Sequence, residues 1–242
     1  MTSPRKVLVA AHERRESEKV LDALARVGLA AERLLALHSG DGPADAPAAL
    51  AAAAGLVLCG GADVDPRRYG EEPIPEARVS LQAGRDEMEW ALVAGARERR
   101  LPVWGLCRGM QVVNVYLGGS LWQDMTLQRP GILAHHVSSP LDALLHRAEV
   151  SAAGRGTAMG EVLGREPAWV NSRHHQAVRR QAAGLVDVAA SPDGIVEAQV
   201  LAGGEWWVES VEWHPENLMA MAQQRALVER FLAAVAAWEE ST

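Results

Sequence analysis

The sequence predicts an α/β fold: a doubly wound, mostly parallel sheet with helices on both faces, extended by antiparallel ribbons in the C-terminal half. Two observations lead to this prediction. In the first half, short apolar runs alternate with segments of helical period, as in parallel strands joined by right-handed crossovers. In the second half, strand-like runs follow one another across turn signals such as Pro192-Asp193-Gly194. The chain has no internal repeat and no convincing linker, so we expect residues 1–242 to form a single domain.

The first half alternates strands and helices, and glycines mark where several of them end. Gly28 ends the first predicted helix, a loop rich in Gly, Pro and Asp covers residues 40–47, and Gly60-Gly61 ends the second strand. Strands are expected over residues 6–11, 56–59 and 102–106, and helices over 16–27, an alanine-rich stretch before the second strand, 86–99 and 109–117. Parallel strands bring their carboxyl ends to one edge of a sheet, so residues that follow these strands should lie near one another.

The second half is less regular. Residues 120–167 show no clear period, and the runs after them are expected to add antiparallel ribbons to the sheet. These runs cover residues 168–171, 185–190, 195–201 and 206–213, and an amphipathic helix over residues 219–238 closes the chain.

The composition is that of a soluble globular protein and argues against several classes of function. Hydrophobic residues make up 48% of the 242 positions and charged residues 23%. The net charge is −7 and the arginines are scattered, so nucleic acid is not an expected partner. No apolar run approaches the roughly 20 residues of a membrane span, and the N-terminal apolar run is too short for a signal peptide. We expect a small-molecule partner and leave open whether the chain forms a homodimer.

Two cysteines, Cys59 and Cys107, cannot form a disulfide framework in a chain of this size. A reducing compartment is therefore expected, which favours a cytoplasmic location. The spacing of cysteines and histidines gives no zinc-binding pattern, so we expect no metal site.

Cys107 lies where a predicted buried strand turns into a helix, within the sequence GLCRG (residues 105–109). This is the form of a nucleophile elbow with Cys in place of Ser, because the tight turn needs residues without a Cβ on either side. The N-terminus of the following helix presents N–H groups and a positive dipole to the sulfur, which favours the thiolate. The alternative is a buried, inert cysteine, which is how we interpret Cys59, because no elbow follows it.

His214 is the predicted general base. It follows the apolar run over residues 206–213 and precedes Pro215 and Glu216. Residues i and i+2 of an extended segment face the same side, so Glu216 can accept the Nδ1 proton of His214 and leave Nε2 toward the sulfur. Without the cysteine elbow, the same residues would indicate only a surface turn.

An oxyanion hole is the third requirement of such a hydrolase. The backbone N–H of Arg108, at the helix start, is one predicted donor. The Gly60-Gly61 turn can supply the second donor, because it follows a neighbouring parallel strand. The polar residues at positions 63–69 come next, and they either frame the leaving group or form a capped, solvated loop.

These stretches resemble the class I glutamine amidotransferases, which have a flavodoxin-like sheet, and within them the γ-glutamyl-γ-aminobutyrate hydrolases of the C26 peptidase group. GLCRGMQ with a distant WHPE is typical of the superfamily, and GGADVDPRRYGEEP and VNSRHHQAV are typical of the hydrolase group. The matching stretches are residues 60–73, 85–93, 102–124, 170–178 and 211–216, which together extend across about two thirds of the chain.

The resemblance implies roles for particular residues. It implies a Cys-His-Glu triad and an oxyanion hole built from the backbone, with Cys107, His214 and Glu216 as the triad and Gly61 and Arg108 as the oxyanion donors. The residues that it implies for binding the α-amino and α-carboxylate groups of a glutamyl substrate are Gln111, Ser172, Arg173 and His174. It also implies that the reaction needs no metal or organic cofactor.

Two histidine pairs do not indicate a metal site. Adjacent side chains of an extended segment point to opposite faces, and no other cluster of ligand residues accompanies His174-His175. His135-His136 follows a loop, and these side chains either line the pocket or lie in solvent.

The first fifty residues and Glu212 depart from the family pattern. The N-terminal region lacks the family's Tyr-containing helix and Ala-Gly-Gly turn; because we expect this region near the site, the identity of the leaving amine stays open. Glu212 replaces the usual Gln of VQWHPE, and the added carboxylate is expected to tune His214 or to favour a cationic amine.

The leading hypothesis is a stand-alone hydrolase that releases glutamate from small γ-glutamyl amines in the breakdown of polyamines or related amines. One alternative is a glutaminase subunit that delivers ammonia to a partner synthetase. Another is a non-catalytic regulatory or binding module on the same fold, against which the complete triad argues.

Overall fold

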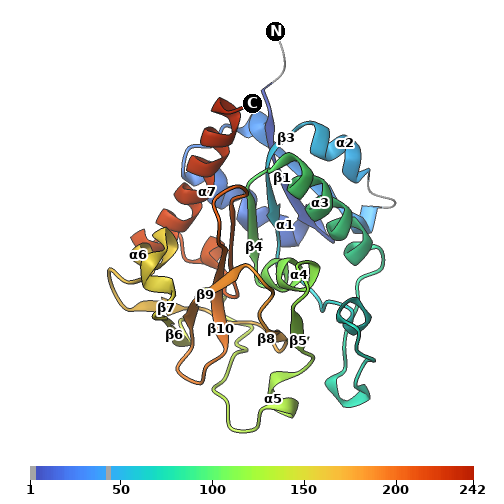
Figure 1. The fold of residues 1–242 in the computed structure, drawn as a ribbon, viewed down its shortest axis with the longest axis vertical. Coiled ribbons are helices and arrows are strands. Elements are labelled where there is room, and N and C mark those ends of the chain that lie inside the picture. The colour runs from blue at the N-terminus through green and yellow to red at the C-terminus, as the bar shows by residue number, and fades with distance from the viewer. Residues whose placement is uncertain (1–3, 42–44) are drawn as a thin grey trace.

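The computed structural model describes residues 4–41 and 45–242. Its centre is a nine-stranded sheet in the order β2-β1-β3-β4-β11-β10-β9-β6-β7 (Figure 1). The strands of this sheet are β1 (Lys6–Ala11), β2 (Leu34–His38), β3 (Ala53–Leu58), β4 (Val103–Leu106), β6 (His146–Val150), β7 (Ala168–Val170), β9 (Leu185–Ala190), β10 (Val196–Leu201) and β11 (Val208–Val211). A separate ribbon pairs β5 (Ser120–Trp122) with β8 (Ala177–Arg180).

The sheet is mixed, with a parallel half and an antiparallel half. Four neighbouring pairs, from β2 to β11, are parallel, in the flavodoxin-like order of doubly wound folds. The other four neighbouring pairs, from β11 to β7, are antiparallel. The predicted α/β class and the antiparallel extension are confirmed, and the sheet contains as many antiparallel pairs as parallel ones.

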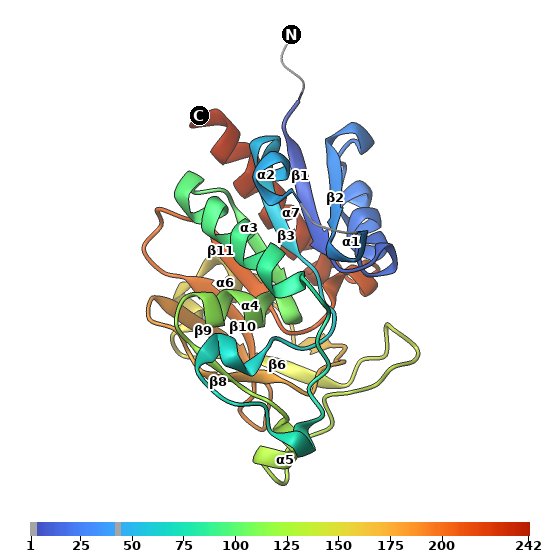
Figure 2. The ribbon, with the colours of Figure 1, turned by 90° about the vertical axis from the view of Figure 1, so that its right-hand side faces the viewer.

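Helices cover both faces of the sheet, as Figures 1 and 2 show. Alternate side chains of β1 enter different cores: Val7 and Val9 pack in the core that α1 and α7 cover, and Leu8 and Ala10 pack under α2, α3 and α4. The longer helices are α1 (Arg14–Arg26), α3 (Arg85–Arg99), α4 (Arg108–Tyr116) and α7 (Ala222–Glu240), and the shorter ones are α2 (Ala46–Ala51), α5 (Met125–Gln128) and α6 (Ala158–Leu163).

The structure contains elements that the sequence did not predict, among them β2, β8 and those of residues 120–167. β2 was not predicted, because its side chains are only partly buried and show no clear alternation. The region over residues 120–167, predicted to be irregular, contains β5, α5, β6 and α6. The loop predicted over residues 40–47 and the start of the N-terminal run fall partly on residues 42–44 and 1–3, which lie outside the described residues.

Three strands of the parallel half end at one edge of the sheet. β3 leads into Gly60 and Gly61, β4 leads into Cys107, and β11 leads into His214. The fold thus brings together the segments that the sequence predicted to carry the chemistry. Among the described residues, no helix has the length and apolar character required to cross a membrane.

Candidate active site

Cys107 occupies a strained turn between β4 and α4. Its φ is 49°, in the left-handed region that residues with a side chain seldom adopt, and its N–H donates to the carbonyl of Val211 at 2.7 Å. A Cβ on Gly105 would lie 2.8 Å from the carbonyl carbon of Gly109, and a Cβ on Gly109 would collide with the carbonyl oxygen of Leu58. Both glycines are therefore required by close backbone contacts, as expected for a nucleophile elbow.

His214 is fixed from its side chain and from its main chain. Glu216 Oε1 lies 2.7 Å from His214 Nδ1, so this carboxylate holds the proton on Nδ1 and leaves Nε2 free to accept another. Asn171 accepts from the N–H of His214 at 2.9 Å and donates to its carbonyl oxygen at 3.1 Å. Asn171 was not predicted, although its position at the end of a predicted strand was available as a signal.

Gly60 lies next to both Cys107 and the imidazole of His214. A Cβ on Gly60 would approach His214 Cε1 to 2.6 Å and Cys107 Cβ to 3.5 Å. The two catalytic candidates therefore meet at one point beside the turn after β3, and only a glycine leaves room for the ring there.

The surroundings of Cys107 disfavour its thiolate form. Burial raises the pKa of Cys107 well above its usual range, and the negative charge of Glu212 raises it further. The charge of Arg173 and the backbone N–H of Arg108 oppose this rise without reversing it. Burial therefore acts on the thiol in the opposite direction to the helix N-terminus, which was expected to favour the thiolate.

The turn predicted to supply an oxyanion donor is braced by Arg85. This fully buried side chain donates to the carbonyls of Cys59 at 3.0 Å and Gly60 at 2.9 Å, and a Cβ on Gly61 would collide with it. With those carbonyls held on one side, the backbone of Gly61 is fixed relative to Cys107. No role was predicted for Arg85, which precedes the helix predicted over residues 86–99.

A buried ionic network links the two predicted oxyanion residues. Arg85 pairs with Glu89 at 2.9 Å, and Glu89 also pairs with the side chain of Arg108. Asp86 binds the other arm of Arg108. Because Arg85 holds the Gly61 turn and Arg108 begins α4, this network from α3 sets the spacing of the two predicted donors.

A cavity of about 360 Å³ opens beside the imidazole. Its lining carries cationic and anionic groups together, which suits a zwitterionic ligand such as a glutamyl group. The lining residues are Arg15, Glu16, Lys19, Gly60, Gly61, Leu141, Arg173, His214, Glu216 and Asn217. Three of them come from α1, which confirms that the divergent N-terminal region lies at the site. A larger hollow of about 670 Å³, between β6 and α6, includes none of these residues.

The four predicted substrate-binding residues occupy two different environments. Arg173 lines the cavity and donates to the carbonyl of Leu141 at 2.9 Å. The other three are buried and bonded within the chain: Ser172 donates to the His135 carbonyl, while Gln111 and His174 bond to the Gln176 carbonyl. Their part in binding substrate stays a prediction.

Glu212 is buried behind the nucleophile, outside the residues that line the cavity. Its Oε1 accepts from the amide of Gln111 and lies 3.4 Å from Nδ1 of His174. Burial raises the pKa of Glu212 well above its usual range, and the hydrogen bond from Gln111 only partly offsets that rise.

The turn after Gly61 is capped from within. Asp65 accepts from the N–H of Arg67 at 3.0 Å and so caps the short helix Pro66–Tyr69. Asp63 is buried and lies 2.8 Å from Nε2 of His175. Of the two interpretations left open by the sequence, the capped loop agrees with these contacts.

Comparisons with known proteins place the chain in a family. The family model for peptidase C26 matches residues 3–216. A Mycobacterium tuberculosis protein with the provisional name glutamine amidotransferase is 44% identical over 162 residues, which make up 67% of this chain and 50% of that protein. The γ-glutamyl-γ-aminobutyrate hydrolase of Escherichia coli is 33% identical over 216 residues, 82% of each chain.

A solved structure of a glutamine amidotransferase from Methylobacillus flagellatus matches with a TM-score of 0.60. The match covers 98% of this chain and 94% of that chain at 18% identity, so it bears on the fold alone. The present chain spans only half the length of its mycobacterial relative.

Proposed function

The chain belongs to the peptidase C26 family, and from this membership we propose that it is a cysteine-dependent hydrolase of small γ-glutamyl amines, which it cleaves to glutamate and a free amine. Its fold is that of the class I glutamine amidotransferases. The observation that carries the proposal is the strained elbow at Cys107, with His214 and Glu216 beside it across Gly60.

The first step forms a thioester. The substrate binds with its γ-amide carbon near the sulfur of Cys107, and His214 Nε2 takes the thiol proton as the sulfur attacks. Burial disfavours the thiolate, which supports a proton transfer that accompanies the attack. The imidazolium then gives the proton to the amine nitrogen as the carbon–nitrogen bond breaks.

The developing oxyanion needs donors that are already in place. The backbone N–H groups of Gly61 and Arg108 are the proposed donors, and the network of Arg85 and Glu89 keeps them in position. Each donor of this kind is worth about 3 to 4 kcal/mol of barrier in other cysteine and serine hydrolases.

The second step releases glutamate. Water enters where the amine left, His214 takes one of its protons, and the resulting hydroxyl oxygen attacks the thioester carbon. The carbon–sulfur bond breaks and the proton returns to the sulfur, so the site is restored without a metal or organic cofactor. The thiol requires a reducing compartment such as the cytoplasm, and polyamine-derived amines are the expected leaving groups.

A glutaminase subunit is the second candidate. The support for it is the glutamine amidotransferase name of the mycobacterial relative, whose identity to this chain, at 44%, exceeds the 33% of the hydrolase. Such a subunit would use the same elbow and base on free glutamine and pass ammonia to a partner synthetase.

The two candidates separate in an assay of glutamate release by the isolated chain. The panel contains γ-glutamyl-γ-aminobutyrate, γ-glutamyl-putrescine, a γ-glutamyl anilide and glutamine, with Cys107→Ala as the inactive variant and Cys59→Ala as the matched control. Turnover of an amide other than glutamine that is lost only in Cys107→Ala supports the hydrolase. Activity confined to glutamine favours the glutaminase subunit.

A further inference from the structure

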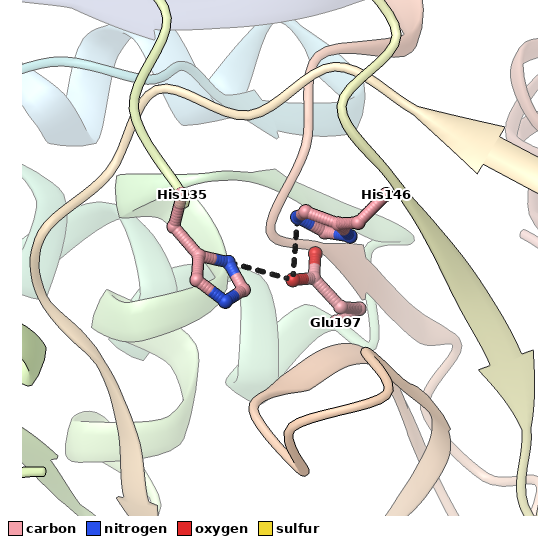
Figure 3. Close-up of side chains that lie close together, drawn as sticks. All are labelled: His135, His146 and Glu197. Carbon is pink, nitrogen blue, oxygen red and sulfur yellow. Dashed lines mark ion pairs between the residues drawn. The ribbon is translucent and has the colours of Figure 1, made fainter. Parts of the chain in front are cut away.

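A second cluster of chemically capable side chains lies apart from the cavity. His135, His146 and Glu197 come from a loop, from the start of β6 and from β10, and all three are at least 96% buried. Figure 3 shows the carboxylate of Glu197 facing both imidazole rings. One nitrogen of each ring and one carboxylate oxygen lie within 4.8 Å of one another.

The spacing within this cluster is wrong for hydrogen bonds. Glu197 Oε1 lies 3.4 Å from His135 Nδ1 and 3.5 Å from His146 Nε2. Both distances exceed the roughly 2.7–3.2 Å between donor and acceptor that is usual for N–H···O hydrogen bonds. Neither of these nitrogens, nor either oxygen of Glu197, has a hydrogen-bond partner. Among the described residues, no lysine or arginine pairs with this buried carboxylate, which faces imidazole rings instead.

The same spacing fits a tetrahedral metal ion. Bonds of about 2.0–2.1 Å to nitrogen and oxygen place neighbouring ligand atoms about 3.3 Å apart. The two distances from Glu197 are close to that value. His174 Nε2, also without a hydrogen-bond partner, lies 3.9 Å from the same oxygen and can take the fourth position after a small shift.

The outward nitrogens of the rings are occupied, as metal-binding histidines require. His135 Nε2 lies 3.0 Å from Asp193 Oδ2, and His174 Nδ1 lies 2.9 Å from the carbonyl of Gln176. His146 Nδ1 makes a longer contact of 3.4 Å with the carbonyl of Arg147. Donation to these oxygens puts the ring proton outside and leaves the lone pair of each inward nitrogen directed at Glu197.

We propose that His135, His146 and Glu197 bind one divalent transition-metal ion of the zinc type, with His174 as the fourth ligand. Nitrogen and carboxylate ligands in a tetrahedral arrangement favour Zn²⁺ among the common divalent ions. His135 and Glu197 lie 62 positions apart in the chain, which is why no spacing motif indicated the site. The burial of every ligand makes the ion structural, so it takes no part in the proposed reaction.

An ion at this position would also affect the active site. The segment that carries His174 also carries Asn171, which holds His214, and Arg173, which lines the cavity. An ion that ties this segment to β6 and β10 would therefore fix the base and the cavity wall together.

The test uses the full, untagged chain, stripped with a chelator, dialysed and titrated with Zn²⁺. Bound zinc is counted by elemental analysis, and Co²⁺ substitution reports tetrahedral coordination through visible absorption. We expect one ion per chain and a higher Tm with zinc. Glu197→Gln and His146→Gln should lose the ion, while His136→Gln, the same change at an exposed neighbour of His135, should retain it.

Asp193→Asn provides a milder variant that leaves all four ligands in place. Loss of the carboxylate behind His135 should weaken zinc binding roughly 10- to 100-fold, the usual effect of such a partner. If the wild-type chain retains no zinc and shows no tetrahedral cobalt spectrum, the proposal is wrong whether or not the variants fold. Equal zinc content in wild type, His146→Gln and Glu197→Gln would overturn it as well. Neither result would overturn the proposed hydrolase, because the ion takes no part in the steps of the reaction.

Discussion

The side-chain amide of Asn171 hydrogen-bonds twice to the main chain of His214: it accepts from the N–H at 2.9 Å and donates to the carbonyl oxygen at 3.1 Å. Glu216 fixes the ring of His214, and Asn171 fixes the backbone from which the ring extends. The base is therefore positioned by a residue that lies 43 positions away in the chain and does not touch the proposed reacting atoms.

Asn171→Ala should reduce catalysis more than binding. Loss of both hydrogen bonds lets the His214 segment shift, and a displacement of about 1 Å can cost roughly 100-fold in rate. We expect kcat to fall by about that factor with little change in KM, and stability to fall by about 1 to 3 kcal/mol. Asn171→Asp, which keeps the acceptor but loses the donor, should be intermediate. Equal kcat in all three chains, measured on folded protein, would contradict this role.

Gly60→Ala should abolish activity by occupying the space of the imidazole. The added Cβ would lie 2.6 Å from His214 Cε1, so the ring must move away from Cys107. We expect kcat/KM to fall by about 100-fold or more. Gly156→Ala is the matched control, because a Cβ there meets nothing within 4 Å. A fully active Gly60→Ala chain would show that the base does not act from this position.

Arg85 should matter for stability and for catalysis by separate routes. Arg85→Met leaves Glu89 buried without one of its partners, which typically costs about 3 to 5 kcal/mol in urea unfolding. Arg85→Lys keeps the charge but loses the fork that binds the carbonyls of Cys59 and Gly60, so we expect a smaller stability loss and a clear loss of kcat. Arg100→Lys, in an exposed ion pair with Glu205, should change neither property. Unchanged kcat in Arg85→Lys would argue against bracing of the oxyanion turn.

Glu212→Gln should stabilise the chain increasingly as the pH rises. Burial raises the pKa of Glu212 above its ordinary value of 4.5, so the folded chain binds this proton more tightly than the unfolded chain. The stabilising contribution is complete below the unfolded pKa and is lost as the pH rises through the folded pKa. Glutamine cannot ionise, so the variant avoids that loss and should gain about 1 to 3 kcal/mol near neutral pH. The check is the difference in Tm between Glu212→Gln and the wild-type chain, which should grow from about pH 4 to about pH 8. A difference that stays constant over this range would contradict the account.

Arg173→Gln should weaken substrate binding and raise the pKa of the nucleophile. Arg173 lines the cavity, and its charge lowers the pKa of Cys107, against the larger effect of burial. We expect KM to rise by about 10-fold or more, as for loss of a charge-assisted hydrogen bond of roughly 1.5 to 3 kcal/mol. The pKa of the Cys107 thiol, measured from the pH dependence of its alkylation, should rise, because removal of a positive charge disfavours the thiolate. An unchanged KM would exclude Arg173 as a carboxylate-binding residue.

Much of the fold could be predicted from the sequence because its strongest signals are local. The apolar run of β1, the glycine after α1 and the glycines around Cys107 each record a constraint within a few residues of themselves. β2 escaped prediction because an edge strand with partly exposed side chains carries no clear period.

Site residues that lie close together in the sequence could be predicted, and those that meet only in the folded chain could not. Glu216 follows His214 by two positions, so its role could be argued from spacing. Asn171 and Arg85 act on segments 43 and 25 or more positions away, and only the folded chain brings them together. Burial of Cys107 likewise arises from packing, and it opposes the effect that was expected from the helix N-terminus.

The most direct test of the central claim is mass spectrometry of the chain, quenched in acid during turnover of a γ-glutamyl anilide. The chain has two cysteines, so the buried Cys59 is an internal control for Cys107 in the same digest. The account predicts a γ-glutamyl thioester on the peptide that contains Cys107, none on the peptide that contains Cys59, and longer survival of the adduct in Glu216→Gln. Release of glutamate with no adduct on Cys107, or undiminished release by Cys107→Ser, would contradict it.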